Sequence, residues 1–281
     1  MTPGTYALVV LSAVTHAYWN FLLKRSGGSP AVVGLSKVAE AILLGPLLLT
    51  GAGTDPAQLF DSWKLPAVGA VLVLLNYLLL TAAYRHGELS LVYPISRGGM
   101  LVFLPPLAFL AIGERLSALG WIAITVIVAG ICFVQVPTAI RGPATVYALL
   151  ASFVAACYTI WDKQAVQALT PLTYFSGYTV LVGVAYVFIL FRTVPVDTAR
   201  TAWAVERKVI LQVGALNIGS YMLTLLALQT GRASYVIALR QLSIAVGAML
   251  GWRLLGEVLS PSRRLGVGLV VVGCVLLALA R

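Results

Sequence analysis

Long apolar stretches separated by short polar connections run through the whole sequence. A helix needs about 20 apolar residues to cross the hydrocarbon core of a bilayer. Ten stretches are long enough, although several contain Gly or Pro; they lie at residues 5–24, 31–50, 65–84, 89–112, 118–136, 143–163, 172–191, 207–228, 233–254 and 263–280. The pattern therefore predicts an all-α integral membrane protein with ten transmembrane helices.

The connections between these stretches are short, and the longest are 51–64 and 192–206. They leave no room for a soluble domain or a nucleotide-binding loop, so we expect no cofactor. The first apolar stretch lacks the basic leader and small-residue cleavage site of a signal peptide, which favours a retained helix.

Composition supports a membrane location. Of 281 residues, 60% are hydrophobic and 10% are charged, whereas soluble domains carry roughly 25% charged residues. The net charge is +10, but the Lys and Arg residues fall mostly in the connections, where they suit lipid headgroups and orientation signals. The expected partners are the lipid bilayer and a small-molecule substrate, and nucleic acid is not expected.

The distribution of Lys and Arg predicts an orientation, since cytoplasmic loops are enriched in them. The odd-numbered connections carry Lys24, Arg25, Arg85, Arg141, Arg192, Arg200, Arg207, Lys208, Arg253, Arg263 and Arg264. The even-numbered connections and the C-terminus carry Lys64, Arg115, Lys163, Arg232 and Arg281. The bias favours odd-numbered connections in the cytoplasm and both termini outside.

The two halves of the sequence resemble each other. Gly-Glu-Arg-Leu-Ser at 113–117 matches Gly-Glu-Val-Leu-Ser at 256–260, and Asn76-Tyr77 runs parallel to Ser220-Tyr221. Other aligned pairs are Lys24 with Lys163, Arg97 with Arg240, Ala123 with Gly266 and Gly130 with Gly273. We therefore expect an N-terminal repeat over 1–138 and a C-terminal repeat over 139–281. Because each has five helices, an odd number, the repeats should have opposite topology, an arrangement typical of transporters.

These repeats, each with Gly-Glu-x-Leu-Ser before its last helix, resemble the EamA branch of the drug/metabolite transporter superfamily. The resemblance implies ten helices and carriage of amino acids, other metabolites or drugs, commonly by export. His16-Ala17-Tyr18-Trp19-Asn20, with Lys24 behind it, is also similar to the first-helix signature of a bacterial subgroup associated with phosphonate utilisation.

Charged residues inside spanning helices are candidates for function because they are costly in lipid. Lys37 and Glu40, three residues apart on one helix face, can pair. They are either a structural ion pair, or Glu40 is a proton-coupling carboxylate or the partner of a substrate ammonium. Glu40 is expected to be essentially the sole carboxylate within the spans.

Arg97 and Arg240 either bond to helix-end carbonyls or bind a carboxylate or phosphonate, which suits the guanidinium fork. Their equivalent places in the repeats predict opposite sides of the midplane, with one arginine at each entrance. Pro94 and Gly98-Gly99 permit a locally opened helix around Arg97.

Aromatic and polar residues within the spans complete the predicted site. The expected substrate-binding residues are His16, Trp19, Asn20, Lys37, Glu40, Tyr77, Tyr93, Arg97, Tyr158, Trp161, Tyr178, Tyr221, Arg240 and Gln241, with Glu40 as the coupling candidate. Glu114 and Glu257 are expected to hold loop backbone, with Ser117 and Ser260 as N-caps.

Together these features predict a secondary transporter. It would move a small amino acid-like zwitterion or an organic anion such as a phosphonate across the bacterial inner membrane by alternating access, in the direction of export, with a proton as the candidate coupling ion. A flippase for a lipid or lipid-linked precursor is the alternative. An enzyme is disfavoured because His16 and His86 are the sole histidines, and no metal site is expected. Monomer and homodimer are both compatible with the small-residue helix faces.

Overall fold

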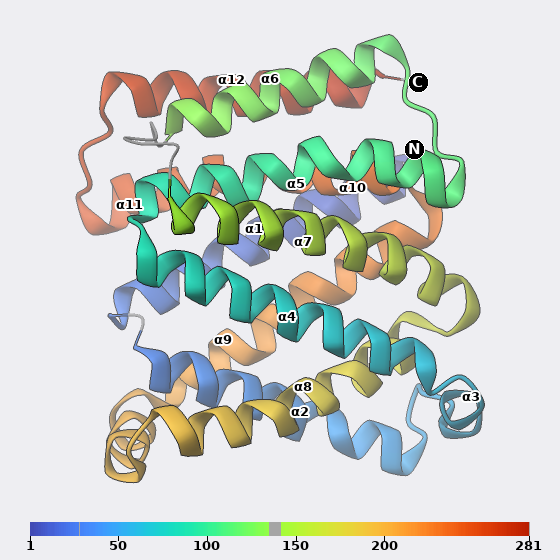
Figure 1. Ribbon diagram of the computed structural model, residues 1–281, viewed down its shortest axis with the longest axis vertical. Helices are drawn as coiled ribbons and strands as arrows, with labels where there is room; N and C mark the ends of the chain where they lie inside the picture. The colour runs from blue at the N-terminus through green and yellow to red at the C-terminus, as the bar shows by residue number, and fades with distance from the viewer. Residues whose placement is uncertain (28, 135–141, 281) are drawn as a thin grey trace.

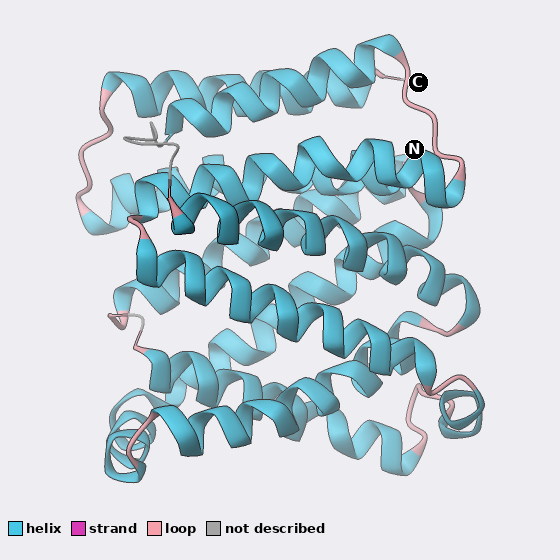
Figure 2. Cartoon of the chain, viewed as in Figure 1, coloured by secondary structure: helices cyan, strands magenta, loops and turns pink. Residues whose placement is uncertain are grey.

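Helices account for nearly all of the computed structural model, which describes residues 1–27, 29–134 and 142–280 (Figures 1 and 2). In chain order they are α1 (Pro3–Arg25), α2 (Pro30–Thr50), α3 (Pro56–Asp61), α4 (Lys64–His86), α5 (Leu89–Ile112), α6 (Ala118–Val134), α7 (Pro143–Ala168), α8 (Pro171–Thr193), α9 (Val196–Thr230), α10 (Ala233–Arg240), α11 (Leu242–Leu255) and α12 (Pro261–Leu279). The expected boundary between residues 138 and 139, and the cations Arg141 and Arg281, lie outside the described residues.

Nine spans within the described ranges are long and apolar enough to cross a membrane, with α10 and α11 counted together. The apolar helix α6 has 17 residues and is shorter than such a span. The last two residues of its predicted stretch, 135 and 136, lie outside the described residues. Within the described residues, each of the ten predicted stretches contains a helix, and nine spans reach the length needed to cross a membrane.

The structure corrects the predicted connection at 192–206, because α9 begins at Val196 and runs for 35 residues. Ala, Arg and Glu between 196 and 208 are good helix formers. The negative charge of Asp197, in the first turn, interacts favourably with the positive end of the helix dipole. Hydropathy alone cannot detect this polar extension. The other long connection contains the short helix α3, which the Asp55 side chain caps by accepting from the Gln58 amide at 2.9 Å.

The helix opening expected near Arg97 lies elsewhere. Helix α5 continues past Pro94, whereas the ninth predicted stretch, 233–254, is divided into α10 and α11. The break falls at Gln241, immediately after Arg240, and the Gln241 carbonyl accepts from the Ile244 amide at 2.8 Å. Arg240 therefore stands at the end of a helix.

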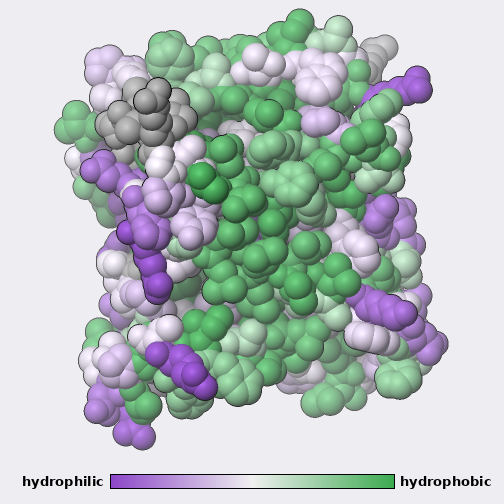
Figure 3. Space-filling model, in the orientation of Figure 1, coloured by the Kyte–Doolittle hydropathy of each residue, from purple (hydrophilic) through white to green (hydrophobic). Residues whose placement is uncertain are grey.

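Apolar side chains cover the middle of the face seen in Figure 3, and hydrophilic residues gather at its two opposite ends. These ends are where the helices terminate and the loops connect them, and both chain termini lie at the same end (Figures 1 and 2). An apolar belt between two polar ends is the surface of a protein that crosses a bilayer.

Helices α6 and α12 lie side by side and approach closely (Figure 1). A Cβ added to Gly130 would lie 2.8 Å from the Gly266 carbonyl oxygen, and one added to Gly273 would lie 3.0 Å from that of Ala123. Small residues allow helices to pack closely in lipid, where apolar burial alone gives no driving force. These glycines therefore serve packing within the chain.

Candidate functional site

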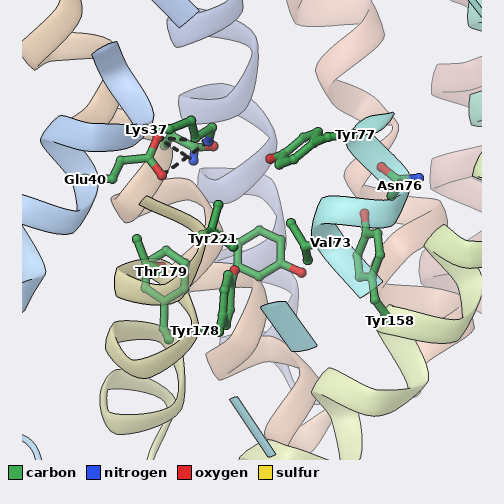
Figure 4. A pocket seen from close by; sticks show the side chains of 12 residues that line it. Lys37, Glu40, Val73, Asn76, Tyr77, Tyr158, Tyr178, Thr179 and Tyr221 are labelled. Carbon is green, nitrogen blue, oxygen red and sulfur yellow. Dashed lines mark hydrogen bonds and ion pairs between the residues drawn. The ribbon is translucent and has the colours of Figure 1, made fainter. Parts of the chain in front are cut away.

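A cavity with an empty volume of about 480 Å³ lies among five helices, α2, α4, α7, α8 and α9. Figure 4 shows polar and aromatic side chains from these helices around it. Its lining consists of Lys37, Glu40, Val73, Asn76, Tyr77, Tyr158, Phe175, Tyr178, Thr179, Val182, Asn217 and Tyr221. Six of the predicted site residues thus meet in one place: Lys37, Glu40, Tyr77, Tyr158, Tyr178 and Tyr221.

The charged part of the lining is the Lys37–Glu40 pair on α2, and the predicted pairing is confirmed. Lys37 Nζ lies 2.9 Å from Glu40 Oε1 and 3.2 Å from Oε2. The Asn217 amide of α9 donates to the same carboxylate at 3.1 Å. The pair presents one cation and one anion to the cavity, which are the groups needed to bind a zwitterion.

Aromatic rings form much of the remaining wall. The Tyr77 ring lies 5.7 Å from the Lys37 ammonium. Phe175 stacks on Tyr221 with ring centroids 5.6 Å apart, and Tyr178 packs edge-on against Tyr221 at 6.2 Å. These rings can cover an apolar part of a ligand, and the tyrosine hydroxyls can hydrogen-bond to it. Thr179 adds a buried hydroxyl that has no hydrogen-bond partner among the described residues.

Next to the cavity, two arginines converge on one histidine. Arg240 Nη2 lies 3.1 Å from His16 Nδ1, and Arg97 Nη2 lies 3.4 Å from His16 Nε2. The Arg240 guanidinium also lies 5.7 Å from the ring centroid of Tyr221, which lines the cavity. The prediction that the two arginines guard separate entrances is therefore wrong, because α1 supplies a single residue that both contact.

This cluster has more donors than acceptors. A neutral imidazole has one acceptor nitrogen and one N–H, so it can accept from Arg240 while its other nitrogen and Arg97 both offer N–H groups. Arg240 also reaches the hydroxyls of Ser12 and Ser220, at 3.3 and 3.5 Å. Within the described ranges, neither arginine forms an ion pair with a carboxylate. The chemistry suits an oxyanion.

A second buried carboxylate lies beside the cavity, which corrects the expectation that Glu40 is essentially alone. Asp162 of α7 is 0% exposed. It accepts from the Tyr174 hydroxyl at 2.6 Å, and the Tyr221 hydroxyl donates to its other oxygen. The sequence carried a signal, since Asp162 falls within the predicted span 143–163. Asp162 was missed because it directly precedes Lys163, which we expected in a connection.

Other predicted site residues do not line the cavity. The Asn20 amide bonds to the backbone of His16 at 2.7 Å, and Gln241 bonds to the backbone of Ile237 at 3.2 Å. The Trp161 indole donates to the Leu65 carbonyl at 2.8 Å and so ties α7 to α4. Hydrogen bonds to backbone carbonyls, within one helix or between two helices, satisfy polar side chains inside a bilayer. A polar residue in a span therefore need not face a ligand.

Two predicted aromatic residues lie at the arginine cluster. Trp19 packs edge-on against His16 with ring centroids 5.0 Å apart, and its buried indole N–H has no hydrogen-bond partner in the part of the chain that the structure describes. The Tyr93 ring lies 5.9 Å from the Arg97 guanidinium. Both therefore pack beside the cluster of His16 and the two arginines.

The two motif glutamates have different roles. Glu114 accepts from the Ala233 and Ser234 amides at 2.7 and 3.0 Å and so caps α10, as predicted for a residue that holds loop backbone. Glu257 instead pairs with Lys24 and Arg263. The hydrogen bond from Lys24 and the attraction of both cations lower the pKa of Glu257 below its usual value, against a smaller opposing effect of desolvation.

The cavity and its surroundings offer no metal centre in the part of the chain that the structure describes. No group of three or more His, Cys, Asp or Glu side chains is close enough there to hold an ion.

The predicted N-caps are present, since the Ser117 hydroxyl accepts from the Gly120 amide and the Ser260 hydroxyl from the Arg263 amide, each at 3.2 Å.

A polar cavity enclosed by apolar spans defines a multi-pass membrane protein of the transporter class. Residues 142–279 match the model of the EamA-like transporter family. The chain belongs to this family, in the drug/metabolite transporter superfamily, and is a membrane transporter.

The fold is shared more widely than the sequence. A protein of known crystal structure superposes with a TM-score of 0.82 at 12% identity, over 98% of this chain and 97% of that chain. At this identity the likeness shows the fold alone. No curated protein matches the sequence.

Proposed function

We propose that this protein is a secondary carrier that moves a small zwitterion or organic anion, such as an amino acid or a phosphonate, across the cell inner membrane by alternating access, in the direction of export. The observation that carries the proposal is that Arg97 and Arg240 converge on His16, while among the described residues neither has a carboxylate partner. Two half-buried guanidinium groups within a bilayer are costly unless they face a partner or an aqueous cavity, and an anionic ligand supplies the missing partner.

The substrate would be held at both ends. Its carboxylate or phosphonate binds at the arginine cluster, and its ammonium binds Glu40 in exchange for Lys37, which lies 2.9 Å away. Tyr221 connects the arginine cluster with the cavity that contains Glu40, because it lines this cavity and its ring lies 5.7 Å from the Arg240 guanidinium. An organic anion without an amine would use the arginine cluster and leave the Lys37–Glu40 pair intact.

The proposed mechanism needs two repeats of inverted topology, over 1–138 and 139–281. The packing of α6 on α12 supports this arrangement, because Gly130 meets Gly266 while their repeat counterparts, Gly273 and Ala123, also meet. If the two repeats are interchanged, each of these contacts therefore takes the place of the other. The two repeats also share the helix ending, since Gly113 and Gly256 both end a helix with φ near +66°.

Similar repeats give two packings of nearly equal energy, one open to each side. A proton remains the proposed coupling ion, and the sequence predicted Glu40 as its carrier. The flippase alternative gains no support from the family match.

Ligand-induced thermal stabilisation of the purified protein tests the proposed function. A panel of amino acids, simple carboxylates and aminomethylphosphonate should contain compounds that raise the unfolding midpoint, since binding to the folded state stabilises it by mass action. Arg240→Ala should retain its fold and lose this stabilisation, and the same compounds should drive exchange transport in wild-type proteoliposomes alone.

Arg264→Ala is the matched control, because Arg264 is exposed at the start of α12. It should respond to ligand as the wild type does. The proposal is contradicted if no anion in the panel stabilises the wild type, or if Arg240→Ala is stabilised equally.

A further inference from the structure

Asp162 is a buried carboxylate that the substrate-binding scheme does not use. It is 0% exposed, and within the described ranges no cation forms an ion pair with it. Its partners are two phenols, Tyr174 on one oxygen and Tyr221 on the other. An isolated buried carboxylate is strongly disfavoured as an anion and loses its charge by binding a proton.

Glu40 differs in this respect. Lys37 supplies a full positive charge at 2.9 Å and Asn217 adds a donor at 3.1 Å. The Glu40 carboxylate is thus matched as an anion, and protonating it would leave the Lys37 ammonium buried without a counter-charge. Of the two buried carboxylates, Asp162 is the one whose protonation leaves no charge unpaired.

The groups that face the Asp162 region come from every helix around it. They are Tyr158 and Lys163 on α7, Tyr77 on α4, Arg97 on α5, Tyr174 and Tyr178 on α8, Tyr221 on α9 and Arg240 on α10. Lys163 bonds to the carbonyls of Leu228 and Gly231 and is satisfied there. Of the two arginines, Arg240 lies 5.7 Å from the ring centroid of Tyr221, the residue whose hydroxyl binds Asp162.

We propose that Asp162 is the proton-binding site that couples transport, connected to the substrate cavity through the Tyr221 hydroxyl; this rests on the proposed carrier function. When the carboxylate takes up a proton, the Tyr221 O–H bond breaks and an O–H bond forms at Asp162 Oδ2. The phenol oxygen regains a proton from a hydronium ion that reaches it from the aqueous side through the cavity, which leaves neutral water. The carboxylate becomes neutral, and no electron changes centre.

The connection to the substrate follows from the position of Tyr221. Its hydroxyl binds Asp162, while its ring lies 5.6 Å from that of Phe175 and 5.7 Å from the Arg240 guanidinium. A bound anion neutralises the arginine cluster and removes positive charge that stabilises an ionised Asp162. Binding of the anion therefore favours uptake of the proton at Asp162, so the two binding events are linked.

Infrared spectroscopy of the reconstituted protein tests the proton site without any substrate. A pH titration should show the carbonyl band of a protonated carboxylic acid at pH values where exposed carboxylates are ionised. Asp162→Asn should remove the band, Tyr221→Phe should shift it, and Glu40→Gln should leave it in place. A band that survives in Asp162→Asn, or is lost in Glu40→Gln, overturns the proposal.

Transport in proteoliposomes gives the second measurement, with radiolabelled alanine and aminomethylphosphonate as probes. Asp162→Asn and Tyr221→Phe should lose accumulation driven by a pH gradient, and Asp162→Asn should retain exchange at equal pH. Gradient-driven accumulation by Asp162→Asn contradicts the proton site. A wild type that exchanges neither probe contradicts the carrier function, while the infrared result still decides whether Asp162 binds the proton.

Discussion

Lys37 and Glu40 form an ion pair on one face of α2, with side chains that are 13% and 4% exposed. Removing one partner leaves the other charge buried, which costs about 3–5 kcal/mol in proteins. We therefore expect Lys37→Met and Glu40→Gln each to lower the thermal unfolding midpoint in detergent. The double variant should regain part of the loss, because neither charge then remains.

A double-mutant cycle measures this coupling. Lys64→Met is the control, since Lys64 is exposed at the start of α4 and its removal should change the midpoint little. If the effects of Lys37→Met and Glu40→Gln simply add, the two residues do not act as a pair.

Two glycines on α12 should respond in opposite ways to the same substitution. A Cβ on Gly266 would lie 2.6 Å from the Gly130 carbonyl oxygen, whereas one on Gly268 meets nothing within 4 Å. Gly266→Ala should separate α6 from α12 and destabilise the protein by about 1–3 kcal/mol. Gly268→Ala should be neutral or stabilising by up to about 1 kcal/mol, because it restricts the unfolded chain. Equal unfolding midpoints for the two variants would contradict the close contact.

The Glu114 cap should control the start of α10. Its carboxylate accepts from two backbone amides at the positive end of the helix. Glu114→Gln removes the charge, and we expect a loss of about 0.5–2 kcal/mol, as for other N-caps. Hydrogen-exchange mass spectrometry should show faster exchange at Ala233 and Ser234. Asp197→Asn, at a side chain 96% exposed, should leave that exchange unchanged.

The Glu257 cluster predicts a dependence of stability on pH. Because folding lowers the pKa of Glu257, its carboxylate stabilises the protein above the usual glutamate value of about 4.3. This contribution is lost as the pH falls through the lowered value. The unfolding midpoints of wild type and Glu257→Gln should therefore differ at neutral pH and converge in acid.

The size of this effect is limited by solvent. The Lys24 side chain is 62% exposed, and exposed pairs contribute at most about 1 kcal/mol. Salt at about 1 M should reduce the difference further by screening. A difference between the two proteins that persists unchanged from neutral to acidic pH would assign the effect to packing instead of charge.

The positions of the helices could be predicted well, because the bilayer imposes one length and one polarity on every span. The motif pair at 113–117 and 256–260 also indicated two helix ends, and both ends are closed by a glycine in the left-handed region. A search for apolar stretches of spanning length does not detect polar extensions of a helix, such as the start of α9 at Val196. The break at Gln241 escaped it too, since no Pro or Gly marks that position.

The candidate site was predicted in part. Charge within a span identified Lys37, Glu40 and the two arginines, but equivalence of position in the repeats misplaced Arg97 relative to Arg240. Asn217 was missed because an amide inside an apolar stretch gives a weak signal. Its partner, Glu40, is 177 residues away in the sequence.

The sequence by itself determined that the chain crosses a bilayer and where its apolar helices lie, because hydropathy and the length of an apolar stretch are local properties of the chain. Only the tertiary structure decided which polar groups meet. His16 lies between two arginines, and Asp162 lies between two tyrosines, because α1 and α7 each pack against several helices. Which side chain satisfies a buried charge depends on those long-range contacts, and no local pattern encodes them.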